Sequence, residues 1–387
     1  MKKVYKFGVI GYGHRLESVF KTFRELWQDW EVSAIADINL DGVKKRMEDF
    51  PEFFAEDCKL YTNEDEMLEK EEFDGILIGT TCSAHTEMAI KALPKNVPLF
   101  LEKPVSINME QLNKLDEASK KYPHRVVVSF PLRFADLAQL AKELIDDGKI
   151  GEVLQVDAYN DVPYGRVYFH NWYRDSYKTG GMWLQKATHD FDYLNYILGQ
   201  KALTIGAMNV RKLFGGDMPE DAKCEGCEKY TECPESPFVV KNVYKDPYGV
   251  PGPWCAFSKQ IDNDNCATAI VKYESGTILN YNQNFFARMS AARRGARFYG
   301  YKGTLEFDWY TNELKIFNHM ANRVDTYKLE TKGDHFGGDM KLAKLFMDLL
   351  TGKTNESYLD QGIESARMCL AATESCENGN FVKLRYF

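Results

Sequence analysis

Residues 180–199, GGMWLQKATHDFDYLNYILG, place a lysine, a histidine and two aspartates in one amphipathic segment behind a Gly-Gly pair. If this segment is helical, His189 and Asp190 follow Lys186 by three and four residues and lie on or near the same face. Leu194 and later apolar residues anchor such a helix in a core. Proton-transfer groups on a rigid element suit redox chemistry on an alcohol. The alternative is a buried helix whose polar side chains make structural hydrogen bonds.

A second group of residues that could do chemistry is formed by Cys224, Cys227 and Cys233. They lie in an insert at about 215–256, which is rich in Gly, Pro and charge and has little apolar periodicity. The spacing predicts a structural metal that staples the insert, with Cys255 as the best fourth ligand and Cys266 as the reserve. Four thiolates favour Zn²⁺, although an iron–sulfur cluster fits the same spacing. Free thiols or a local disulfide are the alternatives without metal.

The N-terminal residues have the order of a dinucleotide-binding unit. A strand at 4–10 leads into a glycine turn and a helix, and a second strand at 32–36 ends at Asp37. Leu16 stands where a third glycine is usual. Asp37 is placed to take the ribose hydroxyls of NAD and to disfavour the 2′-phosphate of NADP. The residues of the turn expected at the cofactor are Gly8, Gly11, Tyr12, Gly13, His14 and Arg15.

Apolar strands continue to alternate with helices up to Phe130, which predicts a doubly wound parallel sheet, an α/β Rossmann fold. Ligands of such sheets bind at the carboxyl ends of the strands. The side chains expected there, at the cofactor, are Thr80, Thr81, His85, Glu102 and Lys103.

After Phe130 the pattern changes to helices and then to successive strands joined by short turns. This predicts a C-terminal α+β domain with a large, open antiparallel sheet, helix-covered on one face. The expected domains are 1–130 for NAD and 131–387 for substrate and oligomer contacts. Aromatic residues follow the later strands and fit either a partner surface or the domain's own core; they include Tyr281, Phe285, Phe286 and Phe298.

Composition narrows the class of protein. The 387 residues carry a net charge of −8, which argues against a nucleic-acid partner. No apolar run is long enough to span a bilayer, and the basic N-terminus lacks a cleavage signal. Most of the nine cysteines are scattered, as in proteins from a reducing compartment. We therefore expect a cytoplasmic protein without membrane partners.

These motifs together resemble the glucose–fructose oxidoreductase, inositol dehydrogenase and rhizopine-catabolism (Gfo/Idh/MocA) family. The resemblance runs through nearly the whole chain and rests on Gly8–Gly13, Asp37, Glu102-Lys103-Pro104, Arg133 in 131–134, residues 148–153, and Gly180-Gly181 with His189 and Asp192. It implies an NAD(P)-dependent oxidoreductase of sugars or cyclitols. It also implies that Lys103 contacts the reacting hydroxyl and that His189 is the acid/base.

One position departs from the family. An Asp is common four residues before the histidine, and this chain has Gln185 there. Lys186 and Asp190 are the candidates to compensate at the substrate. Further residues expected at the substrate are Arg133, His170, Trp172 and Arg174; surface salt bridges and core packing are the alternative, favoured for His170 and Trp172.

We therefore expect an NAD-dependent oxidoreductase that acts on a secondary hydroxyl of a sugar, cyclitol or glycoside. Two alternatives stay open: oxidation of a sugar ring in the service of glycoside cleavage, and a regulatory protein that binds NAD or sugar without turnover. The expected assembly is a homodimer or homotetramer formed through the C-terminal sheet.

Overall fold

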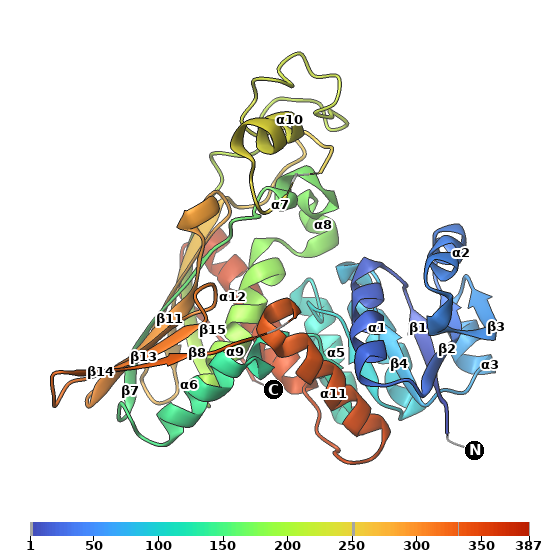
Figure 1. The fold of residues 1–387 in the computed structure, drawn as a ribbon, viewed down its shortest axis with the longest axis horizontal. Helices are drawn as coiled ribbons and strands as arrows, with labels where there is room; N and C mark the ends of the chain where they lie inside the picture. Colours follow the sequence, from blue (N-terminus) through green and yellow to red (C-terminus); the bar gives the residue numbers. More distant parts are fainter. Residues whose placement is uncertain (1–2, 250–251, 332, 387) are drawn as a thin grey trace. The chain divides into compact units, whose positions relative to one another are not determined.

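The computed structural model describes residues 3–249, 252–331 and 333–386. The chain forms two compact units (Figure 1). The first comprises residues 1–136 and 331–367, and the second comprises residues 137–330 and 368–387. The division therefore differs from two consecutive domains, because the chain returns to the first unit after the strands of the second.

The first unit contains a parallel sheet of six strands within the described residues, in the order β3-β2-β1-β4-β5-β6. This is the strand order of a Rossmann fold, and it confirms the predicted doubly wound sheet. The strands are β1 (Tyr5–Ile10), β2 (Trp30–Ala36), β3 (Phe54–Tyr61), β4 (Gly75–Ile78), β5 (Leu99–Leu101) and β6 (Val126–Val128). Strands β4, β5 and β6 are fully buried, as expected for strands covered on both faces.

Helices of the first unit bury apolar stripes against this sheet. On α1 the stripe is Leu16, Val19, Phe20 and Phe23. The helices are α1 (His14–Leu26), α2 (Leu40–Asp49), α3 (Glu64–Lys70), α4 (His85–Ala92), α5 (Met109–Lys121) and α11 (Gly338–Leu350). The late helix α11 belongs here because Phe346 stacks on Phe23 at 5.6 Å and packs on Phe7 at 5.9 Å between ring centroids.

The second unit is built on a sheet of nine described strands in the order β14-β13-β12-β11-β7-β10-β9-β8-β15. Only the β10–β7 pair is parallel among the described pairings, so the predicted antiparallel sheet is confirmed. The strands are β7 (Val153–Asp161), β8 (Ala202–Val210), β9 (Cys266–Tyr273), β10 (Ile278–Asn284), β11 (Arg293–Gly300), β12 (Gly303–Asp308), β13 (Glu313–Asn318), β14 (Arg323–Lys328) and β15 (Val382–Lys383).

Helices line one face of the large sheet (Figure 1). The longer ones are α6 (Asp136–Asp146), α9 (Thr188–Leu198) and α12 (Leu359–Asn378), and α12 begins in the first unit and ends in the second. Short helices α7 (Val167–His170) and α8 (Ser176–Thr179) lie toward the insert, and α10 (Pro237–Val239) lies within it.

The aromatic residues of the later strands mostly fill the unit's own core. Tyr281, Phe285 and Phe298 are fully buried, and Phe191 of α9 packs on Tyr281 at 5.2 Å between ring centroids. Phe286 alone of the four is exposed, at 44%. Across the described part of the chain, no helix has the length and apolar character needed to cross a membrane.

Candidate functional site

The turn between β1 and α1 requires glycine at Gly11. Its φ is +78°, and a Cβ there would lie 2.6 Å from Thr80 Cγ2 and 2.7 Å from the Thr80 backbone. Gly13, the N-cap of α1, is open, since the atom nearest to a Cβ there is Gly79 O at 3.8 Å. The protein therefore leaves space over the first N–H groups of α1, where a dinucleotide pyrophosphate binds in this fold.

Leu16 can stand in place of the third glycine because the residue opposite it on the strand side, Gly79, has no side chain. A Cβ on Gly79, at the end of β4, would lie 2.4 Å from Leu16 Cγ. The glycine of this contact is thus Gly79 at the end of β4, and the large side chain is Leu16 on α1. A close approach of helix and strand, which the third glycine normally allows, is kept.

Asp37 follows β2 and is half-buried. Its Oδ2 accepts a hydrogen bond from the Tyr12 N–H at 2.8 Å, and its Oδ1 accepts one from the Asn39 N–H at 2.7 Å. A carboxylate offers about four lone-pair positions, so capacity for ribose hydroxyls is left. The carboxylate is fixed beside the glycine turn, as the sequence predicts for NAD.

Among the residues predicted at the glycine turn, Tyr12 is buried, His14 is exposed and Gly8 lies within the sheet. Tyr12 is buried and stacks on Phe20 at 5.6 Å between ring centroids, and burial raises the pKa of its hydroxyl. Its side chain therefore belongs to the core, and its backbone belongs to the turn. His14 is exposed. Gly8 lies in β1, where a Cβ would lie 2.9 Å from the Phe73 ring, so it serves packing within the sheet.

Arg15 and Glu102 are joined in an ion-pair network. Arg15 Nε donates to Glu102 at 3.0 Å, and Arg15 Nη2 donates to Asp339 of α11 at 2.7 Å. Burial lowers the pKa of Arg15, but the two carboxylates outweigh it and the pKa is raised. Both predicted cofactor residues thus have structural partners, and the network ties α11 to the strand ends.

His85 links the loop after β4 to the tripeptide after β5. Its buried ring places Nδ1 2.8 Å from Pro104 O and Nε2 3.1 Å from Thr80 O. Both partners are carbonyl oxygens, so a neutral ring can donate to one of them only. Burial lowers the pKa of His85, which favours that neutral ring. Its contacts support a positioning role, while Thr81 is exposed and Thr80 and Lys103 are half-buried.

Arg133 lies in the 3₁₀ turn at Pro131–Phe134 of the first unit. The side chain is buried, and its guanidinium carbon lies 5.5 Å from the centroid of the Tyr358 ring. This cation–π contact supports a packing role for a residue that was expected at the substrate.

In the second unit, the Gly180-Gly181 pair leads into a π-helical turn at Trp183–Ala187 that continues as α9. Both glycines have positive φ, +75° and +85°. π-helical turns are rare and are frequent at functional sites. Gln185 Nε2 donates to Thr179 O at 2.8 Å, so the residue in place of the family's Asp closes the loop. His189 is 8% exposed in the first turn of α9.

Asp190 is fully buried and saturated with donors. It accepts from Asn160 Nδ2 at 2.7 Å, from the Tyr281 hydroxyl at 2.7 Å and from Arg294 Nε at 2.8 Å. Burial lowers the pKa of Arg294, but Asp190 outweighs it and the pKa is raised. These contacts favour a structural role that anchors α9 to the sheet over a contact with substrate.

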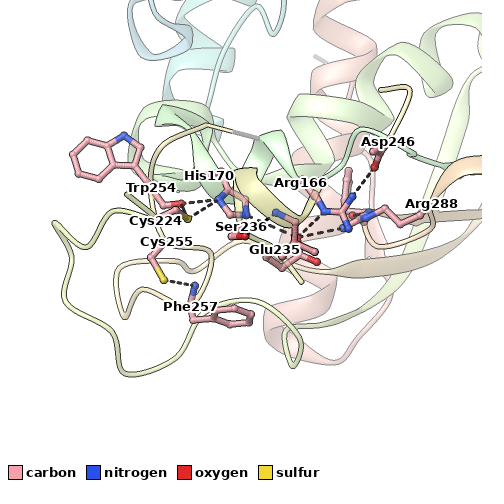
Figure 2. Close-up of polar contacts among 12 residues, drawn as sticks. Arg166, His170, Cys224, Glu235, Ser236, Asp246, Trp254, Cys255, Phe257 and Arg288 are labelled. Atoms are coloured by element: carbon pink, nitrogen blue, oxygen red, sulfur yellow. Dashed lines mark hydrogen bonds and ion pairs between the residues drawn. The ribbon is translucent and has the colours of Figure 1, made fainter. Parts of the chain in front are cut away.

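Lys186 is buried on the same segment, and its ammonium donates to the Tyr164 hydroxyl. The ammonium also lies 4.6 Å from the centroid of the Tyr164 ring. Tyr164 in turn lines a cavity of about 310 Å³ with Arg166, Asp246 and Tyr248 among its other walls. Arg166 pairs with Asp246 at 2.6 Å (Figure 2). The Tyr164 side chain and the Arg166–Asp246 ion pair thus line one cavity, and Lys186 contacts it only through Tyr164.

His170 and Arg174, which were expected at the substrate, make hydrogen bonds to the insert. Figure 2 shows the contact of His170. His170 is fully buried, with Nδ1 2.6 Å from Trp254 O. Arg174 donates to Glu220 O at 2.6 Å, and burial lowers its pKa. Trp172 is 40% exposed and stacks on Tyr173 at 4.1 Å between ring centroids, so it presents a free aromatic face.

The four cysteines predicted as metal ligands line one cavity of about 860 Å³ in the insert. Burial, and then Cys255, Cys233 and Cys227, raise the pKa of the Cys224 thiol to about 12. Within the described residues no three His, Cys, Asp or Glu side chains are gathered tightly enough to hold a metal ion. Cys266 lies in β9 and does not line the cavity.

Sequence reasoning missed the residues that support these sites, namely Tyr164, Arg166, Asn160, Glu235, Asp246, Tyr281 and Arg294. The only signal in the sequence is the run Pro163-Tyr164-Gly165-Arg166 directly after β7. A strand end followed by Gly beside Tyr and Arg suggests a binding loop, whereas the partners on distant strands have no local signature.

Comparison with known proteins defines the class. Residues 5–130 match the model of the oxidoreductase family NAD-binding Rossmann fold, and residues 142–384 match the model of the family's C-terminal alpha/beta domain. The chain belongs to the Gfo/Idh/MocA oxidoreductase family, as its motifs indicated. It is an NAD-binding oxidoreductase of the family that includes the inositol dehydrogenases.

Individual relatives extend over different shares of the chain. YteT of Bacillus subtilis (strain 168) is 28% identical over 364 residues, covering 84% of this chain and 83% of YteT. Myo-inositol 2-dehydrogenase of Thermotoga maritima is 27% identical over 198 residues, covering 51% of this chain and 55% of that enzyme. A solved levoglucosan dehydrogenase, in complex with NADH and levoglucosan, has a TM-score of 0.76 at 16% identity and covers 99% of this chain and 100% of that chain. The structural likeness shows a shared fold.

Proposed function

We propose that this protein is an NAD-dependent oxidoreductase that transfers hydride between the nicotinamide and a secondary hydroxyl of a sugar, cyclitol or glycoside. The observation that carries the proposal is the open glycine turn at Gly11–Gly13 with Asp37 fixed beside it. Names of relatives support the substrate class, since they include inositol dehydrogenases and a levoglucosan dehydrogenase.

The residues present fit NAD. The space over Gly13 accepts the pyrophosphate, and the Asp37 carboxylate accepts the ribose hydroxyls but repels a 2′-phosphate. The Thr80 and Thr81 hydroxyls lie at the same strand ends. When bound, the nicotinamide supplies the hydride acceptor for alcohol oxidation.

The protein's own groups then handle the proton. Lys103, half-buried after β5, binds the reacting hydroxyl and stabilises the negative charge that develops on its oxygen. His189 accepts the hydroxyl proton, because imidazole titrates near neutral pH. These two roles follow the family's motifs, which this chain carries at the matching positions.

We propose that Tyr164 and Lys186 supply the polar groups at the substrate that the family's Asp would supply in place of Gln185. A glutamine amide does not titrate, and Gln185 is occupied by Thr179 O. The Lys186 ammonium donates a hydrogen bond to the Tyr164 hydroxyl, and Tyr164 lines a cavity of about 310 Å³, large enough for a sugar ring. We propose that this cavity contributes to the substrate site and that Arg166 and Asp246 hydrogen-bond to sugar hydroxyls.

Gln185 also favours a second candidate, a protein that binds NAD and sugar for regulation without turnover. Oxidation of a sugar ring as a step in glycoside cleavage is a narrower version of the leading proposal, with the same hydride transfer. The proposals are separated by turnover, because only the two enzymatic ones predict NADH formation.

The test is a screen for reduction of NAD⁺ and NADP⁺ by purified protein with inositols, hexoses, their glycosides and levoglucosan. We expect NADH from at least one compound and a preference for NAD⁺. Reverse reactions with NADH and the corresponding ketoses or inososes are included. Binding of NAD⁺ in calorimetry together with no turnover in either direction would favour the regulatory alternative.

We also propose that the uncovered face of the large sheet joins copies of the chain. Ile270 and Ile278 are 48% and 45% exposed and lie on one face of the β9–β10 pair. Polar and charged residues surround them on the same face, including Lys272 and Asn282. An apolar patch with a polar rim is typical of an interface between subunits.

A further inference from the structure

The insert at 215–256 has little of its own to hold it together. Its regular structure within the described residues consists of α10, a π-helical turn at Val240–Tyr244, and single bridges at Lys223↔Trp254 and Met218↔Ser258. In Figure 1 it extends from the second unit around α10. A segment of this length with few buried apolar residues needs another source of ordering free energy.

Three of its cysteines are brought together by consecutive turns. Cys227 N–H donates to Cys224 O at 3.2 Å, and Gly226 has φ +83°, which fits a type II turn with glycine in third position. Cys233 N–H donates to Lys229 O at 2.8 Å. These turns bring the three cysteines to the wall of one cavity.

The fourth cysteine comes from the other strand of the Lys223↔Trp254 bridge. Cys224 N–H donates to Pro253 O and Cys255 N–H donates to Ala222 O, both at 2.9 Å. These two cysteines flank the bridge and point to the side opposite Lys223 and Trp254, since side chains alternate along a strand. All four thiols line the cavity of about 860 Å³.

The surroundings of the thiols resemble those of metal-bound thiolates. Cys255 Sγ accepts a hydrogen bond from Phe257 N–H at 3.4 Å (Figure 2). Hydrogen bonds of this kind orient metal ligands and offset their charge. Lys223 and Lys229 line the same cavity together with Glu225, Glu228 and Glu232, so its charged lining carries both signs. His170 Nδ1 lies 3.9 Å from Cys224 Sγ but 2.6 Å from Trp254 O, so His170 supports the site from outside.

We propose that Cys224, Cys227, Cys233 and Cys255 bind one Zn²⁺ as a closed tetrathiolate site that fixes the insert. Each thiol loses its proton to solvent when its sulfur binds the ion. The side chains as they stand do not converge on one point. A change of χ1 rotamer re-aims a thiol without moving its backbone. Four sulfur ligands leave no open position, so the role is structural.

The first experiment measures zinc and iron in protein purified without an affinity tag. We expect about one Zn²⁺ per chain, and loss of most of it in Cys224→Ser and in Cys255→Ser. Cys266→Ser is the matched control and should keep wild-type zinc, because Cys266 lies in β9 away from the cavity. Stoichiometric iron with visible absorption would overturn zinc in favour of an iron–sulfur cluster. Metal-free wild-type protein would overturn the site.

The second measurement keeps the test valid if the serine variants fail to fold. Native wild-type protein is alkylated before and after removal of metal with a chelator, and modified cysteines are mapped by mass spectrometry. We expect the four cysteines to be protected until chelation and to react afterwards. Cobalt substitution should give the absorption bands of tetrahedral thiolate coordination. Free reaction before chelation, or a disulfide between any two of the four, would contradict the proposal.

Discussion

At the scale of single residues, contacts divide the predicted site residues into those with room for a ligand and those already occupied. Gly13 and Asp37 keep free space or lone pairs beside the glycine turn. Glu102 is paired with Arg15, and Asp190 is saturated by Asn160, Tyr281 and Arg294. The sequence does not separate these two groups of residues. A carboxylate that binds substrate and one that binds a distant arginine look identical in a local motif.

Asp37 should set the choice of cofactor. Asp37→Asn keeps an oxygen for the Tyr12 N–H but removes the charge that repels a 2′-phosphate, so the NAD⁺-to-NADP⁺ affinity ratio should fall on the order of tenfold. Dissociation constants for both cofactors measure this. Asp41→Asn, at a fully exposed carboxylate of α2, should leave the ratio unchanged. Equal ratios in wild type and Asp37→Asn would show that another residue makes the choice.

Asp190 should act in stability. Asp190→Asn leaves the buried Arg294 without a charge partner, which should lower the free energy of unfolding by about 3 kcal/mol or more. Denaturant unfolding measures this, with Asp146→Asn as an exposed control expected to change by less than about 1 kcal/mol. Wild-type stability combined with lost turnover would instead assign Asp190 to the substrate.

At the scale of elements, the strand and helix pattern was largely predictable. The strands predicted at 4–10 and 32–36 are found as β1 and β2. Helix α2, strand β3 and strand β8 were missed. In β3 most side chains are half-buried or exposed, and β8 becomes exposed toward its end, so their apolar alternation is weak. The π-helical turn before α9 depends on tertiary packing and has no simple sequence period.

The two glycines of the first turn should fail in different ways. Gly11→Ala forces an L-residue to φ +78° against Thr80, so it should destabilise the protein by about 2–4 kcal/mol. Gly13→Ala meets no protein atom within 3.8 Å, so stability should stay close to wild type while NAD⁺ affinity falls at least tenfold. Thermal unfolding and calorimetry measure the two effects. A stable Gly13→Ala with unchanged affinity would place the pyrophosphate elsewhere.

At the scale of the whole molecule, the sequence indicated two domains and the family, but it did not show that residues 331–367 return to the first unit. That return depends on contacts such as Phe346 on Phe23, which join residues over three hundred positions apart. Hydrophobic patterning shows that α11 is amphipathic, and it does not show which core receives the helix.

Assembly through the sheet gives a prediction at this scale. Wild-type protein should sediment as a dimer or tetramer, and Ile278→Asp should shift it toward single chains, because a buried unpaired charge is costly. Ile38→Asp, at a 96% exposed isoleucine of the first unit, is the matched control. A monomeric wild type, or an oligomer indifferent to Ile278→Asp, would exclude this face.

The central claim, hydride transfer to NAD⁺ assisted by Lys103, is tested most directly by Lys103→Met with the substrate found in the screen. The lysine acts on the reacting hydroxyl, so the rate of NADH formation should fall about 10²–10⁴-fold. The affinity for NAD⁺, near which Lys103 is also expected to lie, should fall far less than the rate, since the hydroxyl contact acts in the transition state. A variant that binds NAD⁺ normally and still forms NADH at a rate near that of wild type would contradict the account.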